Sequence, residues 1–124
     1  MNRYMQAVAA VVLGVATFAG SAQAEGDAAR GKSIFTRCSS CHAVTAQNKV
    51  GPSLLGIFGR TAGTLPGAKY SKGMVASGIV WSDETLGTFL TAPAKSVPGT
   101  TMPLGVPNAQ DRDDLIAYLK SVTP

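Results

Sequence analysis

Two residue types that commonly bind metals or carry protons are scarce in this sequence. The 124 residues include one histidine, His42, and two cysteines, Cys38 and Cys41. A structural zinc site needs four protein ligands, so these three side chains alone cannot close one. A single histidine also excludes any site that requires two histidines from one molecule. Chemistry that depends on these side chains must therefore be built around positions 38–42.

Aromatic residues are few as well, at 6% of the chain. The formal net charge is +4, but no basic run is interleaved with aromatics, which argues against nucleic-acid binding. Fourteen glycines and seven prolines indicate much irregular backbone, and a short chain of this kind struggles to bury enough apolar area to fold alone. We therefore expect a bound apolar group to supply part of the core.

Long hydrophobic runs are missing except near the start of the chain. Arg3 precedes an apolar run over 7–19, and Ala22-Gln23-Ala24 offers the small residues that signal peptidase recognises. The run is shorter than the roughly 20 residues of a membrane span, which disfavours a retained anchor. We predict that 1–24 is a cleaved secretory signal and that 25–124 is one domain of charge +3, located in the periplasm without a membrane span.

The remaining pattern predicts an all-α fold of three to five short helices, because no segment alternates with period 2 over a useful length. Ser82 and Asn108 are expected N-caps, each followed by acidic residues in the first helical turn. Glycine and proline break 44–67, and a long loop is expected over 93–107. The predicted helices cover 26–37, 71–77, 83–92 and 109–122.

The segment Cys38-Ser39-Ser40-Cys41-His42 has the C-x-x-C-H spacing of a covalent haem attachment site. Two thiols about one helical turn apart can add to the two vinyl groups of one haem. The histidine that follows then lies under the iron as a ligand. This pattern predicts one covalently bound haem c, with its iron, as the cofactor.

Two other interpretations of the cysteine pair account for less of the sequence. A disulfide across so short a loop would constrain little of the unfolded chain and would leave His42 unexplained. A thioredoxin-like redox pair requires an adjacent βαβ pattern, and the sequence predicts no strands.

Because His42 is the only histidine, a second axial ligand must be of another type. Beyond residue 24 two methionines remain, Met74 and Met102, and a thioether is the soft ligand expected opposite histidine in electron-transfer haems. Met102 lies in the proline-restricted loop, which can wrap to the far haem face. Met74 lies in a predicted short helix, where core packing is the usual role. The sequence favours Met102 without excluding Met74 or an open site.

The sequence resembles the small class I c-type cytochromes, related to mitochondrial cytochrome c and its bacterial relatives. The resemblance covers nearly all of 25–124. Besides the haem motif it includes Gly31 and Phe35, Gly51-Pro52-Ser53-Leu54, Gly59-Arg60, Trp81, Pro98-Gly99-Thr100-Thr101-Met102 and Asp114-Leu115-Ile116-Ala117-Tyr118-Leu119-Lys120.

The resemblance implies a class I cytochrome c fold and a role for each matching residue. His42 and Met102 would be the axial ligands, and the Pro52 carbonyl would accept a hydrogen bond from the His42 ring. Arg60, Tyr70 and Trp81 would hold the haem propionates, and Thr100 would brace the methionine loop. The sequence departs from the family at Phe89, Met74 and Leu104, where a tyrosine, an asparagine and an aromatic residue are usual.

The implied function is single-electron transport in a respiratory or related chain, by a monomer and not by an enzyme. Redox proteins would be the donor and acceptor, such as membrane complexes or periplasmic dehydrogenases, in brief encounters guided by Lys32, Lys49 and Lys95. Two alternatives stay open. One is a haem subunit bound permanently to a periplasmic dehydrogenase, and the other is a gas-binding or peroxidatic protein with an open iron site.

Overall fold

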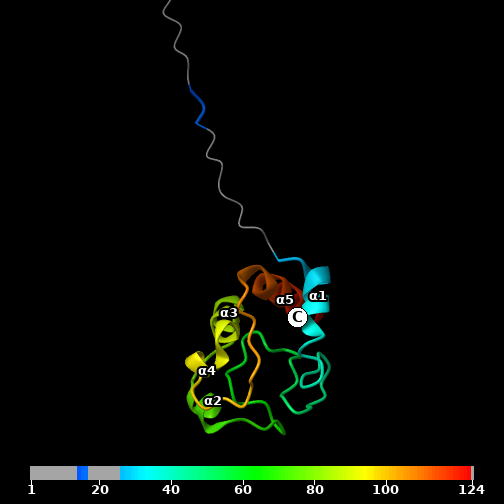
Figure 1. Cartoon of the computed structure of the whole chain (residues 1–124), viewed down its shortest axis with the longest axis vertical. Coiled ribbons are helices and arrows are strands. Elements are labelled where there is room, and N and C mark those ends of the chain that lie inside the picture. Colours follow the sequence, from blue (N-terminus) through cyan, green and yellow to red (C-terminus); the bar gives the residue numbers. More distant parts are fainter. Residues whose placement is uncertain (1–13, 17–25, 124) are drawn as a thin grey trace, which may run out of the picture.

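The computed structural model describes residues 14–16 and 26–123, so nearly all of the predicted signal segment lies outside it. In this described part of the chain, five helices follow one another in the sequence (Figure 1). Within the described residues the β-structure is one isolated antiparallel bridge, between Thr61 and Val80. This confirms the predicted all-α fold. The helices are α1 (Ala28–Phe35), α2 (Lys72–Ala76), α3 (Asp83–Thr91), α4 (Pro93–Ser96) and α5 (Ala109–Val122).

The predicted caps of α3 and α5 are present. The Ser82 hydroxyl accepts a hydrogen bond from the Thr85 N–H, and the Asn108 side chain accepts one from the Asp111 N–H. These side chains satisfy backbone donors that have no partner inside the helix. Within 14–16 and 26–123, no helix combines the length and apolar character needed to cross a bilayer.

The helices α2 and α3 end within one residue of the prediction, and the larger differences lie in two other segments. α1 is shorter than 26–37: Asp27 caps it by accepting from Ala29 and Arg30, and it ends at Phe35. Residues 36–41 continue as hydrogen-bonded turns. The predicted loop from Pro93 instead starts with α4, where proline suits the first helical position because its missing N–H is not needed there.

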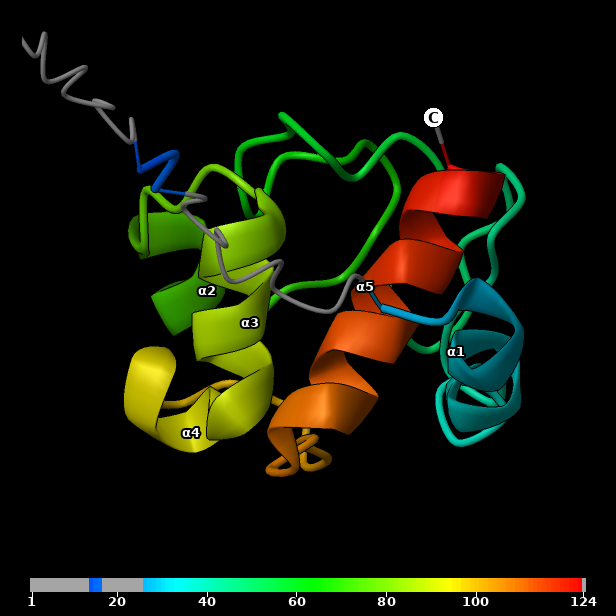
Figure 2. The ribbon, with the colours of Figure 1, turned by 90° about the horizontal axis from the view of Figure 1, so that it is seen from above.

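α5 lies between α1 and α3 and packs against both (Figure 2). α1 approaches α5 closely at Gly31, where a Cβ atom would lie 1.9 Å from the Asp114 carbonyl oxygen. No larger residue fits that crossing without moving a helix. These three helices supply eight residues of the buried core, namely Ile34, Phe35, Leu86, Phe89, Leu90, Leu115, Ile116 and Leu119, and the other core residues, Leu54, Ile57, Ala62, Trp81, Val97 and Val106, lie outside them.

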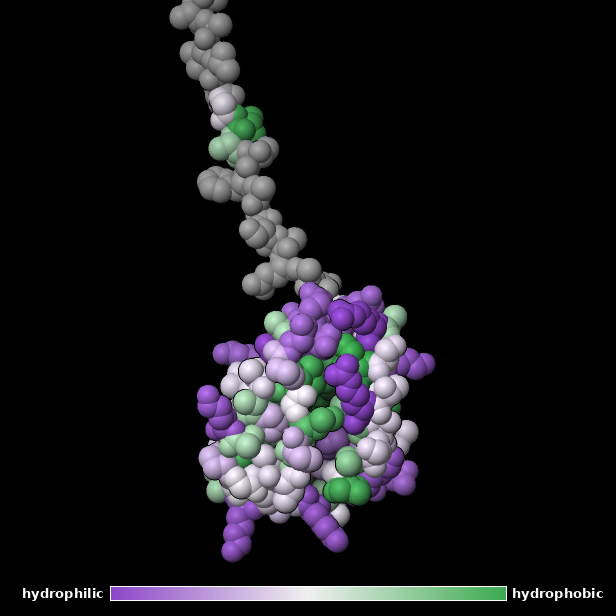
Figure 3. Space-filling view, in the orientation of Figure 1, coloured by the Kyte–Doolittle hydropathy of each residue, from purple (hydrophilic) through white to green (hydrophobic). Residues whose placement is uncertain are grey.

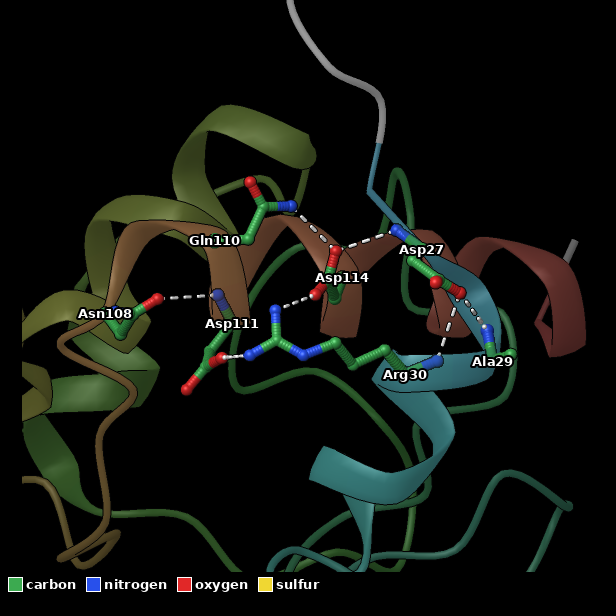
Figure 4. A network of polar contacts seen from close by, with 7 residues as sticks. All are labelled: Asp27, Ala29, Arg30, Asn108, Gln110, Asp111 and Asp114. Atoms are coloured by element: carbon green, nitrogen blue, oxygen red, sulfur yellow. Dashed lines mark hydrogen bonds and ion pairs between the residues drawn. The ribbon is translucent and has the colours of Figure 1, made fainter.

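The buried carboxylate of Asp114 on α5 holds α5 and the start of α1 together through hydrogen bonds (Figure 4). Asp114 is 1% exposed, and it accepts from the Asp27 N–H at 2.7 Å, the Gln110 amide at 2.9 Å and the Arg30 guanidinium at 2.8 Å. The Asp27 backbone bond, followed by the Gln110 bond, holds the pKa of Asp114 below its usual value, and the Arg30 charge adds to this effect. The network therefore favours the ionised form of Asp114.

The lowered pKa of Asp114 predicts acid sensitivity. Its contribution to stability is present above the usual aspartate pKa of about 3.9 and is lost as the pH falls toward the lower pKa of the folded state. We expect Asp114→Asn to lower the urea midpoint at neutral pH and to flatten its acid dependence. Asp113→Asn, at an exposed neighbour, is the control. Equal acid dependence in the wild type and Asp114→Asn would contradict the assignment.

Candidate haem site

A cavity of about 550 Å³ opens between the helices, the long segment that joins α1 to α2, and the loop that joins α4 to α5. Its lining is mostly apolar, and in Figure 3 hydrophobic residues show in the middle of the face, with a strongly hydrophilic one beside them and others around the edge. All nine site residues predicted from the sequence line this single cavity: Cys38, Cys41, His42, Pro52, Arg60, Tyr70, Trp81, Thr100 and Met102.

The turns that follow α1 hold the cysteine pair. The N–H groups of Cys41 and His42 both donate to the Cys38 carbonyl, at 3.1 and 2.9 Å, which places the two thiols about one helical turn apart. Both thiols are free and half-buried. Burial raises the pKa of Cys38, partly opposed by the Arg37 charge. A raised thiol pKa is opposite to the lowered pKa that is typical of reactive redox cysteines.

The His42 ring is oriented by the backbone that faces it. Its Nδ1 lies 2.8 Å from the Pro52 carbonyl oxygen, which can only accept, so Nδ1 carries the proton and donates. In the neutral ring this leaves the other nitrogen, Nε2, as the one with a free lone pair for a metal. The contact to Pro52 therefore selects the tautomer that a metal-binding histidine needs.

Gly51 makes room for this ring. A Cβ atom there would lie 2.5 Å from His42 Cε1 and 2.9 Å from Nδ1, closer than real contacts permit. The His42 ring can thus pack directly against the backbone of residue 51, because glycine has no side chain. Sequence reasoning treated Gly51 only as a turn residue and as part of the family pattern. The position of glycine directly before the accepting proline was the available signal.

We expect Gly51→Ala to displace the His42 ring and to lower the free energy of unfolding by about 1–3 kcal/mol, as overpacking does. The absorption spectrum of the loaded protein should change as well, because the Nδ1 bond to Pro52 would be strained. Gly87→Ala in α3 is the matched control, since its nearest neighbour would be 4.0 Å away. A stable variant with an unaltered spectrum would refute the steric argument.

Arg60, Tyr70 and Trp81 form another part of the wall. Arg60 donates to the carbonyl oxygens of Ser53, at 2.8 Å, and Leu55. The Tyr70 hydroxyl accepts from the Leu65 N–H at 3.3 Å. Trp81 is buried. The structure brings these three residues together at one cavity, although its contacts for Arg60 and Tyr70 are to backbone.

Met102 and Met74 both line the cavity. The Met102 N–H donates to the Thr100 hydroxyl at 3.3 Å, a local bond that shapes the loop. α2 supports this loop closely: a Cβ at Gly73 would lie 2.3 Å from the Pro98 carbonyl oxygen. Sequence reasoning missed Gly73, because only the folded chain brings α2 against the methionine loop.

The cavity suits a haem on chemical grounds. It offers two thiols for covalent attachment, an imidazole nitrogen and thioether sulfurs for iron, and apolar walls for the porphyrin. The family model described as "Cytochrome c" matches residues 28–123. The chain belongs to the cytochrome c family.

The relatives agree with this assignment. Cytochrome c2 of Agrobacterium tumefaciens (strain II Chrys) is 50% identical over 101 residues, covering 77% of this chain and 91% of the relative. Cytochrome c of Tetrahymena pyriformis is 52% identical over 100 residues, covering 79% and 91%. The solved structure of cytochrome cH from Methylobacterium extorquens superposes with a TM-score of 0.73 at 41% identity, covering 77% of this chain and 99% of that one. This cytochrome is an electron-transfer protein with one covalently attached haem c, not an enzyme.

Proposed function

We propose that this cytochrome carries single electrons between redox proteins in the periplasm, with its haem iron bound by His42 and Met102. The observation that carries the proposal is the convergence of the sole histidine and the loop methionine on one cavity that also holds the cysteine pair. When bound, the haem supplies an iron that accepts and releases one electron. Histidine with methionine ligation in an apolar site favours Fe(II) and a raised potential.

The chain's own residues would keep the iron site closed to other chemistry. Pro52 fixes the His42 tautomer. The turn at Thr100 places Met102, from a loop much later in the sequence, in the same cavity. The buried side chains of Trp81 and Phe89, with ring centroids 5.3 Å apart, exclude water from the cavity wall. If His42 and Met102 both hold the iron, neither dioxygen nor a substrate would reach the metal, which would suit a carrier.

The decisive experiment is an absorption spectrum of the purified oxidised and reduced protein, with and without carbon monoxide. We expect the spectrum of a covalently attached, low-spin haem that does not change when carbon monoxide is added to the reduced protein at neutral pH. Carbon monoxide binding under these conditions would show an open iron site and overturn the proposed ligation.

The charge distribution supports a contact surface for acidic partners at this cavity. Residues 28–82 contain seven basic residues and no acidic one. Every charged residue that lines the cavity is basic, namely Arg37, Arg60 and Lys69. Exposed apolar side chains lie beside them, with Val50 at 79% and Leu104 at 45% exposure. None of the three lysines expected to guide partners lines the cavity, although Lys49 directly precedes the lining residue Val50.

We expect Lys69→Glu to slow electron transfer to an acidic redox protein by about fivefold at low ionic strength. That factor follows from reversing one charge about 8 Å from a unit charge in water. The difference should shrink at high salt because screening shortens the range of the interaction. Lys120→Glu changes the net charge equally but lies on α5, away from the cavity lining. Equal slowing by both variants would contradict a contact surface at the cavity.

We also propose that 1–24 is removed on export, leaving 25–124 as the mature domain. The short apolar run and the small residues at Ala22 and Ala24 support this. Mass spectrometry of the protein from the periplasm tests it: the expected chain starts at Glu25, and a chain that retains the apolar run would contradict cleavage.

A further inference from the structure

Charge is divided unevenly between the two stretches of chain that border the cavity. Residues 28–82 include seven basic residues and no acidic one. Between Glu84 and Asp111, in contrast, the chain has a single charged residue, Lys95. Both stretches contribute side chains to the lining of the same cavity. The cavity is therefore bordered by a basic stretch on one part of its wall and by an almost uncharged stretch on another.

The lining residues from 35 to 81 form what we call the basic wall. Two of its cations, Arg37 and Lys69, line the cavity and are exposed to solvent. In the described part of the chain the ion pairs are made by Arg30 and Lys120 instead. The charges of Arg37 and Lys69 are thus available to a partner that approaches the cavity.

The lining residues from 86 to 104 form the uncharged wall. Its exposed members are Thr101, Pro103 and Leu104. Lys95, the one charge of this stretch, lies on α4 outside the lining. In Figure 1 the loop from α4 to α5, drawn in orange, lies nearer α3 and α4, whereas the segment that follows α1, drawn in cyan to blue-green, lies further to the right. The two walls therefore meet a partner at different places.

We infer that the cavity mouth is a two-sided contact surface: a redox partner docks with carboxylates facing the basic wall and with an uncharged, apolar edge on the uncharged wall. Carboxylates over the uncharged wall would lose water without gaining a cation, which costs free energy. Screening limits the reach of exposed charges to about 8 Å at physiological salt, so each wall acts on the part of the partner that faces it. The surface thus selects one orientation of the partner. This inference rests on the proposed function, because it specifies the partner of that cavity.

The first test maps where an anion collects on the reduced, haem-loaded protein by NMR. The probe is hexacyanochromate(III), a paramagnetic trianion that exchanges no electrons with the protein. It should broaden the amide signals of 37–40 and 69–72 roughly fivefold more than those of 100–104, the order expected for a trianion near one screened unit charge. A neutral gadolinium chelate is the reference, because it reports accessibility without charge. Even broadening of both walls, relative to this reference, would overturn the two-sided surface.

One added cation provides a matched pair of variants for the same map. Thr101→Lys places a positive charge on the uncharged wall, so broadening by the anion should extend to 100–104. Thr88→Lys adds the same charge at an exposed position of α3 outside the lining, and it should leave the signals of 100–104 unchanged. The same map for Thr101→Lys as for the wild type would contradict the position of this wall at the mouth.

The apolar half of the surface is tested with a flavodoxin, a small acidic redox protein, as the partner. Leu104 is 45% exposed, and Leu104→Ser should weaken binding measured by calorimetry by about fivefold, because less apolar area is buried. The salt dependence of binding should not change. Leu55→Ser is the matched control, since Leu55 is 41% exposed and lies outside the lining. Wild-type affinity in Leu104→Ser would overturn the apolar contact. An open iron site in the carbon monoxide experiment would reject the proposed ligation and not this surface.

Discussion

Replacing Cys38 and Cys41 together with alanine is expected to leave little folded protein. The cavity beside these thiols has a volume of about 550 Å³ and is lined by residues that also form the hydrophobic core, among them Phe35, Leu86 and Leu115. An enclosed unfilled cavity costs about 24 cal/mol per Å³, which gives an upper limit of roughly 13 kcal/mol for this partly open cavity before its walls collapse. Small domains have a total stability of about 5–15 kcal/mol, so loss of the attached haem removes most of it.

The double variant should be produced in a host that attaches haem to cytochromes, and then examined by circular dichroism and mass spectrometry. We expect a low yield, a mass without haem and a spectrum with little helix. Ser39→Ala combined with Ser40→Ala is the matched control, because it alters the same turn and leaves both thiols. A helical, cooperatively unfolding apoprotein would show that the polypeptide closes its core unaided.

The parts of the fold that depend on neighbours in the sequence were predictable. Ser82 and Asn108 cap α3 and α5 as expected, since a cap is a hydrogen bond across three residues. α4 was not predicted, because Pro93 both ends one helix and begins the next. A pattern that ends α3 at proline cannot show that the same proline suits the first turn of another helix.

For the site residues, how much could be predicted depended on whether a motif, a count of possible ligands or a family resemblance pointed to them. The haem motif named Cys38, Cys41 and His42 by spacing alone, the count of possible ligands favoured Met102, and resemblance to a family added five residues; the fold gathers all nine at one cavity. Contacts between residues that are far apart in the sequence and meet only in the folded chain could not be predicted. The Asn48 amide donates to the Pro66 carbonyl oxygen, 18 residues away, and no local pattern indicates this contact. The need for glycine at position 73 likewise becomes visible only in the fold, where the Pro98 carbonyl oxygen lies too close for a Cβ atom.

Met102→Ala is expected to keep the covalent haem and open one face of the iron. Its side chain lies in the cavity on a loop shaped by the Thr100 hydroxyl, and alanine offers no atom that can bind a metal. The reduced variant should therefore bind carbon monoxide stoichiometrically at neutral pH, whereas the wild type should not. The reduction potential should fall, because the thioether that favours Fe(II) is gone. Peroxidase activity should rise, since peroxide can then reach the metal.

Met74→Ala provides the discriminating comparison, because both methionines line the same cavity. If Met102 is the ligand, Met74→Ala should lose packing without gaining carbon monoxide binding. The cost of that packing is at most the roughly 2–5 kcal/mol of a methionine to alanine change in a core, and Met74 is only half-buried. The reverse result, with Met74→Ala opening the iron and Met102→Ala leaving it closed, would move the ligand from the loop to α2. In that case the loop from Pro98 to Met102 would pack over the haem without supplying an iron ligand.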